Sequence, residues 1–299
     1  MEHIHQNKNM HFLKVFYSVS INPIYFNCLH NKTMGSVCGA SKGRSQSVKP
    51  SPKVPDSHER ITFISANNTE LSDLQSYFIA QQGMNRKIKT LYEAVFAHED
   101  QQIFTIDLKF IDLCANHSHL ANILPSFVNL NSLNLWKARL GVEGIKDLAK
   151  PIQTLSKLRY LSLADNNLGP EGIQYLCTAF AKLESLQTLE LHINGLGPRG
   201  AEILGKDLPK LLKLNTISLT ENEIGPDGIK FLIAAFVTMP NLQTIFLSQN
   251  AIGDAGGKCF LDSIQKLQHI KTLSLEGNDI SGDMIEDLVE ESPSINFKF

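Results

Sequence analysis

A repeat of 28 residues runs through the last two thirds of the chain and constrains the fold more than any other feature. Apolar residues at the spacing Leu-x-x-Leu-x-Leu recur six times at this interval, and a further triplet lies 27 residues upstream. The triplets are Ile103/Ile106/Leu108, Leu130/Leu133/Leu135, Leu158/Leu161/Leu163, Leu186/Leu189/Leu191, Leu214/Ile217/Leu219, Leu242/Ile245/Leu247 and Ile270/Leu273/Leu275. Because internal repeats of roughly 20 to 50 residues are typical of stacked architectures, the chain is predicted to fold as an array of similar units.

Each unit combines a strand pattern with a helix pattern. The triplet alternates apolar and polar positions, as a half-buried strand does, and Ile173, Leu176 and Phe180 then follow at helical spacing. Proline in the Gly-Pro-x-Gly step at 169–172, 197–200 and 225–228 suits the first turn of a helix. An asparagine stands three residues after five of the triplets, where it would satisfy buried backbone groups. These residues are Asn166, Asn194, Asn222, Asn250 and Asn278.

The spacing Leu-x-x-Leu-x-Leu-x-x-Asn-x-Leu resembles that of the leucine-rich repeat family over residues 103–299. The unit length and the Leu-Gly-Pro-x-Gly step resemble its ribonuclease-inhibitor-like subclass. The resemblance implies an α/β solenoid, or horseshoe, with a concave parallel sheet and convex helices. Simple geometry agrees, because parallel strands lie about 4.8 Å apart whereas packed helices need about 8–10 Å, so the sheet must be the inner layer.

Three regions are predicted along the chain. Residues 1–60 hold eight Lys and Arg against three acidic residues and include a polar, proline-rich stretch, so we expect a disordered basic tail. Residues 61–102 are expected to cap the first repeat, with a degenerate strand at Ile61/Ile64 and helices over 71–80 and 88–97. Residues 103–299 form the repeat domain, closed by a short strand around Phe297. Ile111 and Ala138 interrupt the asparagine column, which predicts strain or a different turn in the first two repeats.

Composition excludes several classes of protein. The net charge of −2 argues against a nucleic-acid binder, and no run of about 18 apolar residues could span a membrane. The five cysteines are scattered without a Cys-x-x-Cys motif, which favours a reducing, cytoplasmic location.

The short motifs that resemble cofactor or metal sites each lack a feature that such a site requires. The dinucleotide-like match at 195–200 reuses glycines that belong to the repeat, and the phosphate-loop spacing at 200–206 lacks the Ser or Thr that would hold magnesium. Cys114, His117 and His119 cluster but lack a fourth donor for zinc. We therefore expect no cofactor, no metal and no enzymatic activity.

The predicted concave face carries the candidate binding site. The residues between the leucines point away from the core and form three columns across the strands. One column contains Trp136 and His192, and its neighbours contain Tyr160, Glu190 and Phe246, with Asp165 one position beyond. Exposed aromatic residues beside charges are typical interface anchors, so these residues are predicted to bind a protein partner, with Trp136 exposed. The alternative is that Thr and Ser merely suit the sheet while Trp136 packs under the cap.

The amino-terminal tail suggests a second attachment. Met34-Gly35-Ser36-Val37-Cys38 resembles a myristoylation start at Gly35 followed by a cysteine, Cys38, that could be palmitoylated. Basic residues downstream would supply the second signal that a single acyl chain needs. Peripheral membrane association therefore follows if translation begins at Met34.

The sequence thus predicts a non-catalytic scaffold that binds a protein partner. The alternative is a GTPase-activating protein, since the Ran GTPase activator is similar in repeat subclass. That family carries a long acidic carboxyl-terminal stretch, which this chain lacks. A third reading, the receptor domain of an immune sensor, would require an attached nucleotide-binding domain.

Overall fold

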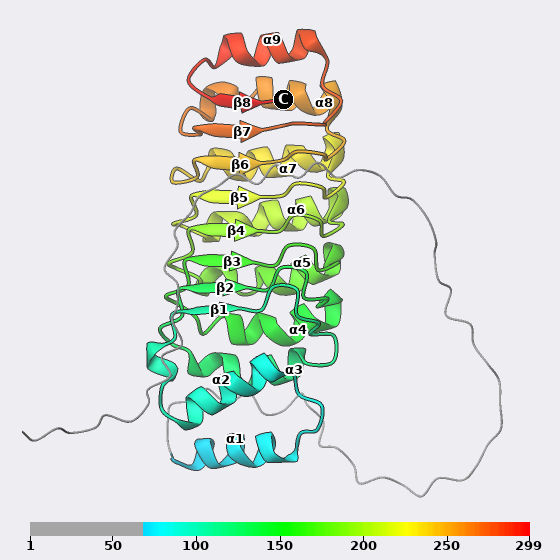
Figure 1. Ribbon diagram of the computed structural model, residues 1–299. Coiled ribbons are helices and arrows are strands. Elements are labelled where there is room, and N and C mark those ends of the chain that lie inside the picture. Colours follow the sequence, from blue (N-terminus) through cyan, green and yellow to red (C-terminus); the bar gives the residue numbers. More distant parts are fainter. Residues whose placement is uncertain (1–67) are drawn as a thin grey trace, which may run out of the picture. The chain divides into compact units, whose positions relative to one another are not determined.

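The computed structural model describes residues 68–299, which stack as strand–helix units along one axis (Figure 1). Eight parallel strands form one sheet in the order of the sequence. Their three-residue length and regular spacing match the predicted repeat. The strands are β1 (Thr105–Asp107), β2 (Ser132–Asn134), β3 (Tyr160–Ser162), β4 (Thr188–Glu190), β5 (Thr216–Ser218), β6 (Thr244–Phe246), β7 (Thr272–Ser274) and β8 (Asn296–Lys298).

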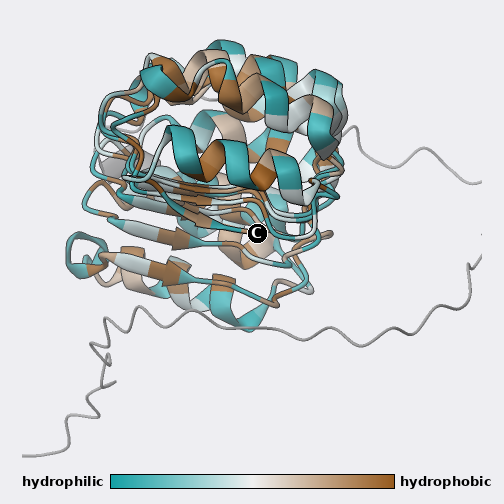
Figure 2. Cartoon of the chain, turned by 90° about the horizontal axis from the view of Figure 1, so that it is seen from above, coloured by the Kyte–Doolittle hydropathy of each residue, from teal (hydrophilic) through white to brown (hydrophobic). Residues whose placement is uncertain are grey.

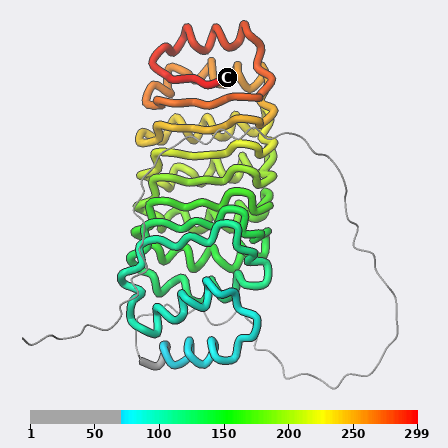
Figure 3. The backbone as a smooth tube through the Cα atoms, viewed as in Figure 1, coloured from blue at the N-terminus to red at the C-terminus, as the bar shows by residue number. Residues whose placement is uncertain are grey.

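Helices of successive repeats cover one face of this sheet. Figure 2 shows the helix layer and the sheet as two separate layers, and Figure 3 shows the backbone alternating between them. The other face of the sheet, here called the open face, carries no helix. The helices are α1 (Asn68–Ala80), α2 (Arg86–Phe96), α3 (His117–Ile123), α4 (Gly141–Ile152), α5 (Gly169–Cys177), α6 (Gly197–Asp207), α7 (Gly225–Val237), α8 (Gly253–Leu261) and α9 (Gly282–Glu291). Short 3-10 turns lie at Asp100–Gln102, Leu124–Ser126, Phe180–Lys182, Leu208–Lys210 and Ile264–Lys266.

The core lies between the two layers. The central residues of β2 to β6, Leu133, Leu161 and Leu189 among them, are fully buried in one core with helix residues such as Ile173 and Leu204. This arrangement confirms the prediction that each repeat buries its leucines toward the helices. None of the helices within residues 68–299 combines the length and the apolar character that a bilayer crossing requires.

The asparagines form a continuous ladder inside the turns that leave the strands. The Nδ2 group of Asn222 donates to the carbonyl oxygens of Leu191, at 3.0 Å, and of Leu219, at 2.9 Å, while its Oδ1 accepts from the backbone N–H of Asn194. Asn166, Asn194, Asn250 and Asn278 repeat this pattern. Because each side chain joins two repeats, the ladder satisfies buried backbone groups that would otherwise cost about 1–3 kcal/mol each.

The first two repeats, where the asparagine is missing, differ from each other. At Ala138 the flanking Lys137 and Arg139 keep the positive φ angles, 53° and 57°, that the later repeats have at the same positions. The backbone N–H of Ala138 still donates to Asn166 Oδ1, so the turn keeps its shape and this repeat does not have a different turn. At Ile111 the turn departs from the pattern, since Phe110 has a positive φ of 61° but Asp112 does not.

The predicted helices of the amino-terminal region are present as α1 and α2. The rings of Tyr77, Phe78, Tyr92 and Phe96 pack together between them, and the hydroxyl of Tyr77 lies 2.6 Å from Nδ1 of His119 in α3. Helix α2 also contacts the edge of the sheet, where Lys87 Nζ donates to the carbonyl oxygen of Asp107. The predicted strand at the other end is β8. The tail over 1–60 and the strand expected at Ile61/Ile64 lie outside the described residues.

Candidate functional site

The columns predicted for the open face are confirmed by the strand register. Ser132, Tyr160 and Thr188 pair across β2, β3 and β4, as do Asn134, Ser162 and Glu190. Backbone hydrogen bonds align the third column as well, because the N–H of Lys137 donates to the carbonyl oxygen of Ala164 and that of Asp165 to the carbonyl oxygen of His192. The position of each candidate residue on the sheet is therefore fixed by the strand register.

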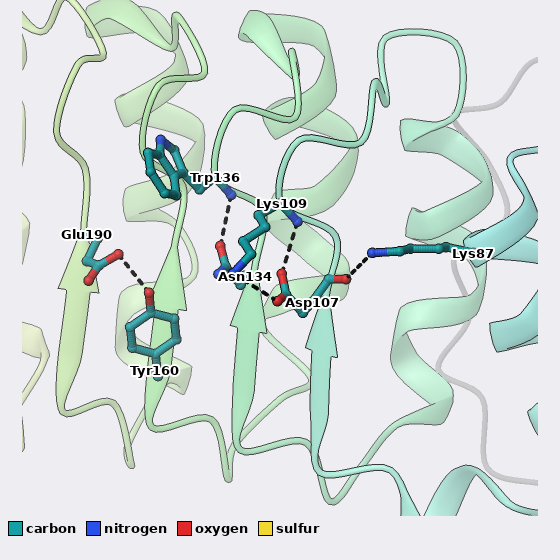
Figure 4. A network of polar contacts seen from close by, with 7 residues as sticks. All are labelled: Lys87, Asp107, Lys109, Asn134, Trp136, Tyr160 and Glu190. Carbon is teal, nitrogen blue, oxygen red and sulfur yellow. Dashed lines mark hydrogen bonds and ion pairs between the residues drawn. The ribbon is translucent and has the colours of Figure 1, made fainter. Parts of the chain in front are cut away.

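Trp136 is half-buried, less exposed than its column position predicts. Its ring centroid lies 4.9 Å from that of Phe110 and 6.0 Å from that of His192. Strands β2 and β4 are about 9.6 Å apart at the usual strand spacing, so the indole must lean across β3 to approach His192. Figure 4 shows the ring over the carboxyl end of the strand that carries Tyr160.

Two small residues, Ser162 in β3 and Ala164 two positions after it, make this arrangement possible. Ala164 and Ser162 are 0% and 1% exposed although they lie on the face that has no helices. Trp136 and His192 flank Ala164 in its column, and Asn134 and Glu190 flank Ser162. The larger side chains of the flanking residues therefore cover Ala164 and Ser162.

Two buried polar atoms in this region have no hydrogen-bond partner. They are Nε1 of Trp136 and Oγ of Ser162, and they are the only such side-chain atoms in the part of the chain that the structure describes. Buried polar groups in native proteins are nearly always paired, so each exception calls for an explanation. Both exceptions fall within the cluster of Trp136, Tyr160, Ser162, Glu190 and His192, here called the aromatic cluster.

Tyr160 is fixed by a charged neighbour. Its hydroxyl donates to Oε2 of Glu190 at 2.7 Å, diagonally across β3 and β4 (Figure 4). Burial raises the pKa of Tyr160 well above its ordinary value, and the negative charge of Glu190 raises it further. The phenol is therefore a hydrogen-bond donor at neutral pH, and its orientation is set before any partner arrives.

His192 is held in its neutral form. Burial lowers the pKa of His192 below 6.5, and this effect outweighs the nearby carboxylates of Glu190, Glu221 and Asp165, which raise it. Its Nδ1 lies 3.5 Å from Oγ of Ser218, a weak contact at best. At neutral pH this imidazole contributes an uncharged, aromatic edge beside Trp136.

The remaining predicted site residues lie at the margins of the cluster. Asp165 forms an ion pair with Lys137, at 3.4 Å, and its backbone has a positive φ of 52°. Phe246 is half-buried on β6, two strands beyond Glu190, with Ser218 and Ser274 as its neighbours in register. The structure brings Trp136, Tyr160, Glu190, His192 and Asp165 together, and it leaves Phe246 apart.

Sequence reasoning missed several residues around the cluster. Phe110 is 57% exposed and contacts Trp136, although it lies in the turn after β1 and outside the three columns. A hollow of about 430 Å³ lies at the carboxyl ends of β3 to β6, lined by Asp165, which was predicted, and by Ile193, Glu221 and Glu223 among others. A signal for these residues exists in the sequence, since Ile193 and Glu221 immediately precede asparagines of the ladder.

The residues considered for metal and cofactor binding have other contacts. Nδ1 of His117 lies 2.9 Å from Oδ2 of Asp147, His119 contacts Tyr77, and Cys114 is exposed. No cluster of His, Cys, Asp and Glu within residues 68–299 is arranged to hold a metal. The segment with phosphate-loop spacing is part of helix α6, with Leu204 in the core.

Gly35 and Cys38, the predicted acylation sites, lie outside the described residues.

These features define the class of the protein as a solenoid of strand–helix repeats joined by a buried asparagine ladder. A family model described as leucine-rich repeat matches residues 154–177, 210–232, 238–261 and 266–283. Each matched segment contains helix residues of a repeat seen in the structure. These four stretches of the chain therefore match leucine-rich repeats, and the structure continues the same strand–helix unit on both sides of them.

Similar solved structures share little sequence with this chain. Actin-binding site 2 of leiomodin-1 is 14% identical, with a TM-score of 0.40 over 49% of this chain and 86% of the other. A protein from Bacteroides fragilis is 14% identical, with a TM-score of 0.38 over 70% of this chain and 68% of the other. No curated protein matches the sequence.

Proposed function

We propose that the protein is a non-catalytic interaction module that binds a protein partner on the open face of its sheet, centred on Trp136 and Tyr160. Leucine-rich repeat proteins generally act as interaction scaffolds. The observation that carries the proposal is the pair of unpaired buried atoms, Trp136 Nε1 and Ser162 Oγ, in the aromatic cluster. An unpaired donor costs about 1–3 kcal/mol, so a partner that supplies an acceptor as these side chains adjust would regain that energy.

Beyond the adjustment that gives access to these two atoms, the cluster suits binding because neighbouring residues already hold its two aromatic anchors in place. Phe110 and His192 contact the indole of Trp136, and Glu190 holds the phenol of Tyr160. A partner would then need to order few side chains, which lowers the entropic cost of association. Trp and Tyr are common among the residues that dominate binding energy at interfaces. Phe246 would form a second, separate contact with a large partner.

Paired variants test the proposal. Replacement of both aromatic residues, Trp136→Ala with Tyr160→Ala, should weaken partner binding by about 2 kcal/mol or more, or roughly thirtyfold. The matched control is Phe231→Ala, which removes an aromatic residue that is 43% exposed on helix α7. Partners captured by the wild-type protein and by the control, but not by the double variant, would be identified by mass spectrometry and titrated by calorimetry.

Thermal unfolding of all three proteins separates binding from folding. We expect similar midpoints, because the two replaced residues are half-buried on the face without helices. A partner that binds the double variant and the wild-type protein equally well would contradict the proposal.

A further inference from the structure

We propose that the partner segment on the aromatic cluster is basic and inserts an Arg or Lys side chain into the hollow beside His192. This inference rests on the proposed function and specifies the chemistry of the partner. The hollow has a volume of about 430 Å³, near the lower end for ligand pockets, and it opens at the carboxyl ends of β3 to β6. A space of this size has room for one long side chain.

The walls of the hollow are acidic. Asp165, Glu221 and Glu223 line it, and none of its lining residues is Lys or Arg. Lys137 pairs with Asp165 from outside, whereas Glu221 and Glu223 form no ion pair with any side chain in the described part of the chain. Gln249 adds an amide oxygen that can accept a further hydrogen bond. A guanidinium or ammonium group would satisfy these acceptors, whereas the phosphates of a nucleic acid or an anionic membrane would be repelled.

An apolar side chain in the same hollow favours a long cationic residue. Ile193 lines the hollow and is 39% exposed. Arg and Lys carry an apolar stem that packs on such surfaces and a charged head that reaches polar groups beyond it. The combination of Ile193 with Glu221 and Glu223 therefore matches both parts of one side chain.

The hollow is continuous with the aromatic cluster. Ile193 follows His192 directly, and the ring of His192 lies 6.0 Å from that of Trp136. The N–H of Asp165 donates to the carbonyl oxygen of His192 at 2.8 Å, which joins the wall of the hollow to the cluster. One short peptide can therefore place an apolar side chain against Trp136 and a neighbouring basic side chain in the hollow.

A peptide selection with the full chain tests this inference. Bead-displayed random peptides, with all residue types at equal frequency, would be selected on the wild-type protein and measured by fluorescence anisotropy. We expect enrichment of Arg and Lys next to apolar residues, and affinity that falls as salt rises. The variant Glu221→Gln with Glu223→Gln should weaken the selected peptides about tenfold.

Matched variants and distinct outcomes make the test decisive. The control is Glu286→Gln with Glu290→Gln, which removes two exposed carboxylates from helix α9 and should leave affinity unchanged. Peptides that require Trp136 but show no basic enrichment would overturn this inference and leave the proposed function standing. Selected peptides that bind the Trp136→Ala with Tyr160→Ala variant as well as the wild-type protein would overturn both.

Discussion

The two faces of the sheet are built from the same strands but differ in how strictly they repeat. On the helix side, each strand from β1 to β7 presents a leucine or isoleucine at its centre, and Leu161, Leu189 and Ile217 are all fully buried. On the open face, the third column changes from Trp136 through Ala164 to His192 within three repeats. Stacking requires the same shape from every unit on the helix side.

The open face has no such requirement, because no helix packs against it. The aromatic residues, the unpaired polar atoms and the hollow all lie on it or at its edge. Side chains on the helix side are thus explained by packing alone, whereas those of the open face need another explanation. Partner binding supplies one.

The contributions of the two faces to stability can be compared most directly by replacing two neighbouring residues of one strand. Leu189→Ala should lower the free energy of unfolding by about 2–5 kcal/mol, because it leaves a cavity in the core between β4 and the helices. Thr188→Ala, one residue earlier on the open face, should change it by about 0.5 kcal/mol or less. Urea denaturation measures both. Equal losses would show that the open face contributes to stability as the core does.

The asparagine ladder should behave as part of the packed side. Asn222→Ala leaves the carbonyl oxygens of Leu191 and Leu219 and the N–H of Asn194 without their partner. We expect a loss of about 2–4 kcal/mol in the free energy of unfolding. The control is Asn241→Ala, an exposed residue whose Nδ2 donates to the carbonyl oxygen of Leu212. Guanidinium denaturation that finds similar losses for both variants would remove the special role of the ladder.

At the edge of the open face, one residue is held at a cost to stability. Ile193 has a positive φ of 57°, which is unfavourable for a β-branched side chain but tolerated by Asn. Ile193→Asn should therefore raise the free energy of unfolding by about 1 kcal/mol. It should also weaken binding of basic peptides, because the apolar wall of the hollow is lost. Glu221→Asn, at the equivalent position of the next repeat, is the control, with a smaller gain expected.

A smaller effect is the pH dependence of stability, which involves one histidine on helix α3 and one on the open face. Burial lowers the pKa of His119 and of His192 in the folded protein below the ordinary value of 6.5. The unfolded chain then binds more protons between the folded and unfolded pKa values, so stability rises with pH across that window. Stability should be complete above about pH 6.5 and decline below it.

Single variants assign this pH dependence. His119→Gln and His192→Gln should each flatten the decline measured by denaturation between about pH 7.5 and about pH 5. His119→Gln should in addition weaken the docking of α1, since it alters the contact with Tyr77. A decline that is unchanged in both variants would assign it to other groups.

Much of the fold could be predicted from the sequence, because the fold depends mainly on the repeat length of 28 residues. The 28-residue interval fixes the strands, the helices and the faces on which Leu189 and Thr188 lie. The aromatic cluster is only partly predictable. The columns bring Trp136 and His192 near each other, but the tilt of the indole depends on the small size of Ala164 between them.

Apart from Asp165, the residues of the hollow could not be predicted from the alternating strand pattern. Phe110, Ile193 and Glu221 lie in turns where the backbone has positive φ angles, and these angles decide where the side chains point. An alternating rule applies only within a strand, so it gives no direction for the residues that follow. The unpaired atoms of Trp136 and Ser162 likewise depend on neighbours in three strands.

The most direct test of the account uses Trp136, the only tryptophan of the chain, in the unmodified protein. Quenching of its fluorescence by acrylamide would be measured with and without a partner shown by calorimetry to bind. If the partner covers the open face, the quenching constant should fall as the complex saturates, with the same midpoint as the binding isotherm. A saturated complex in which Trp136 is quenched as readily as in the free protein would contradict the account.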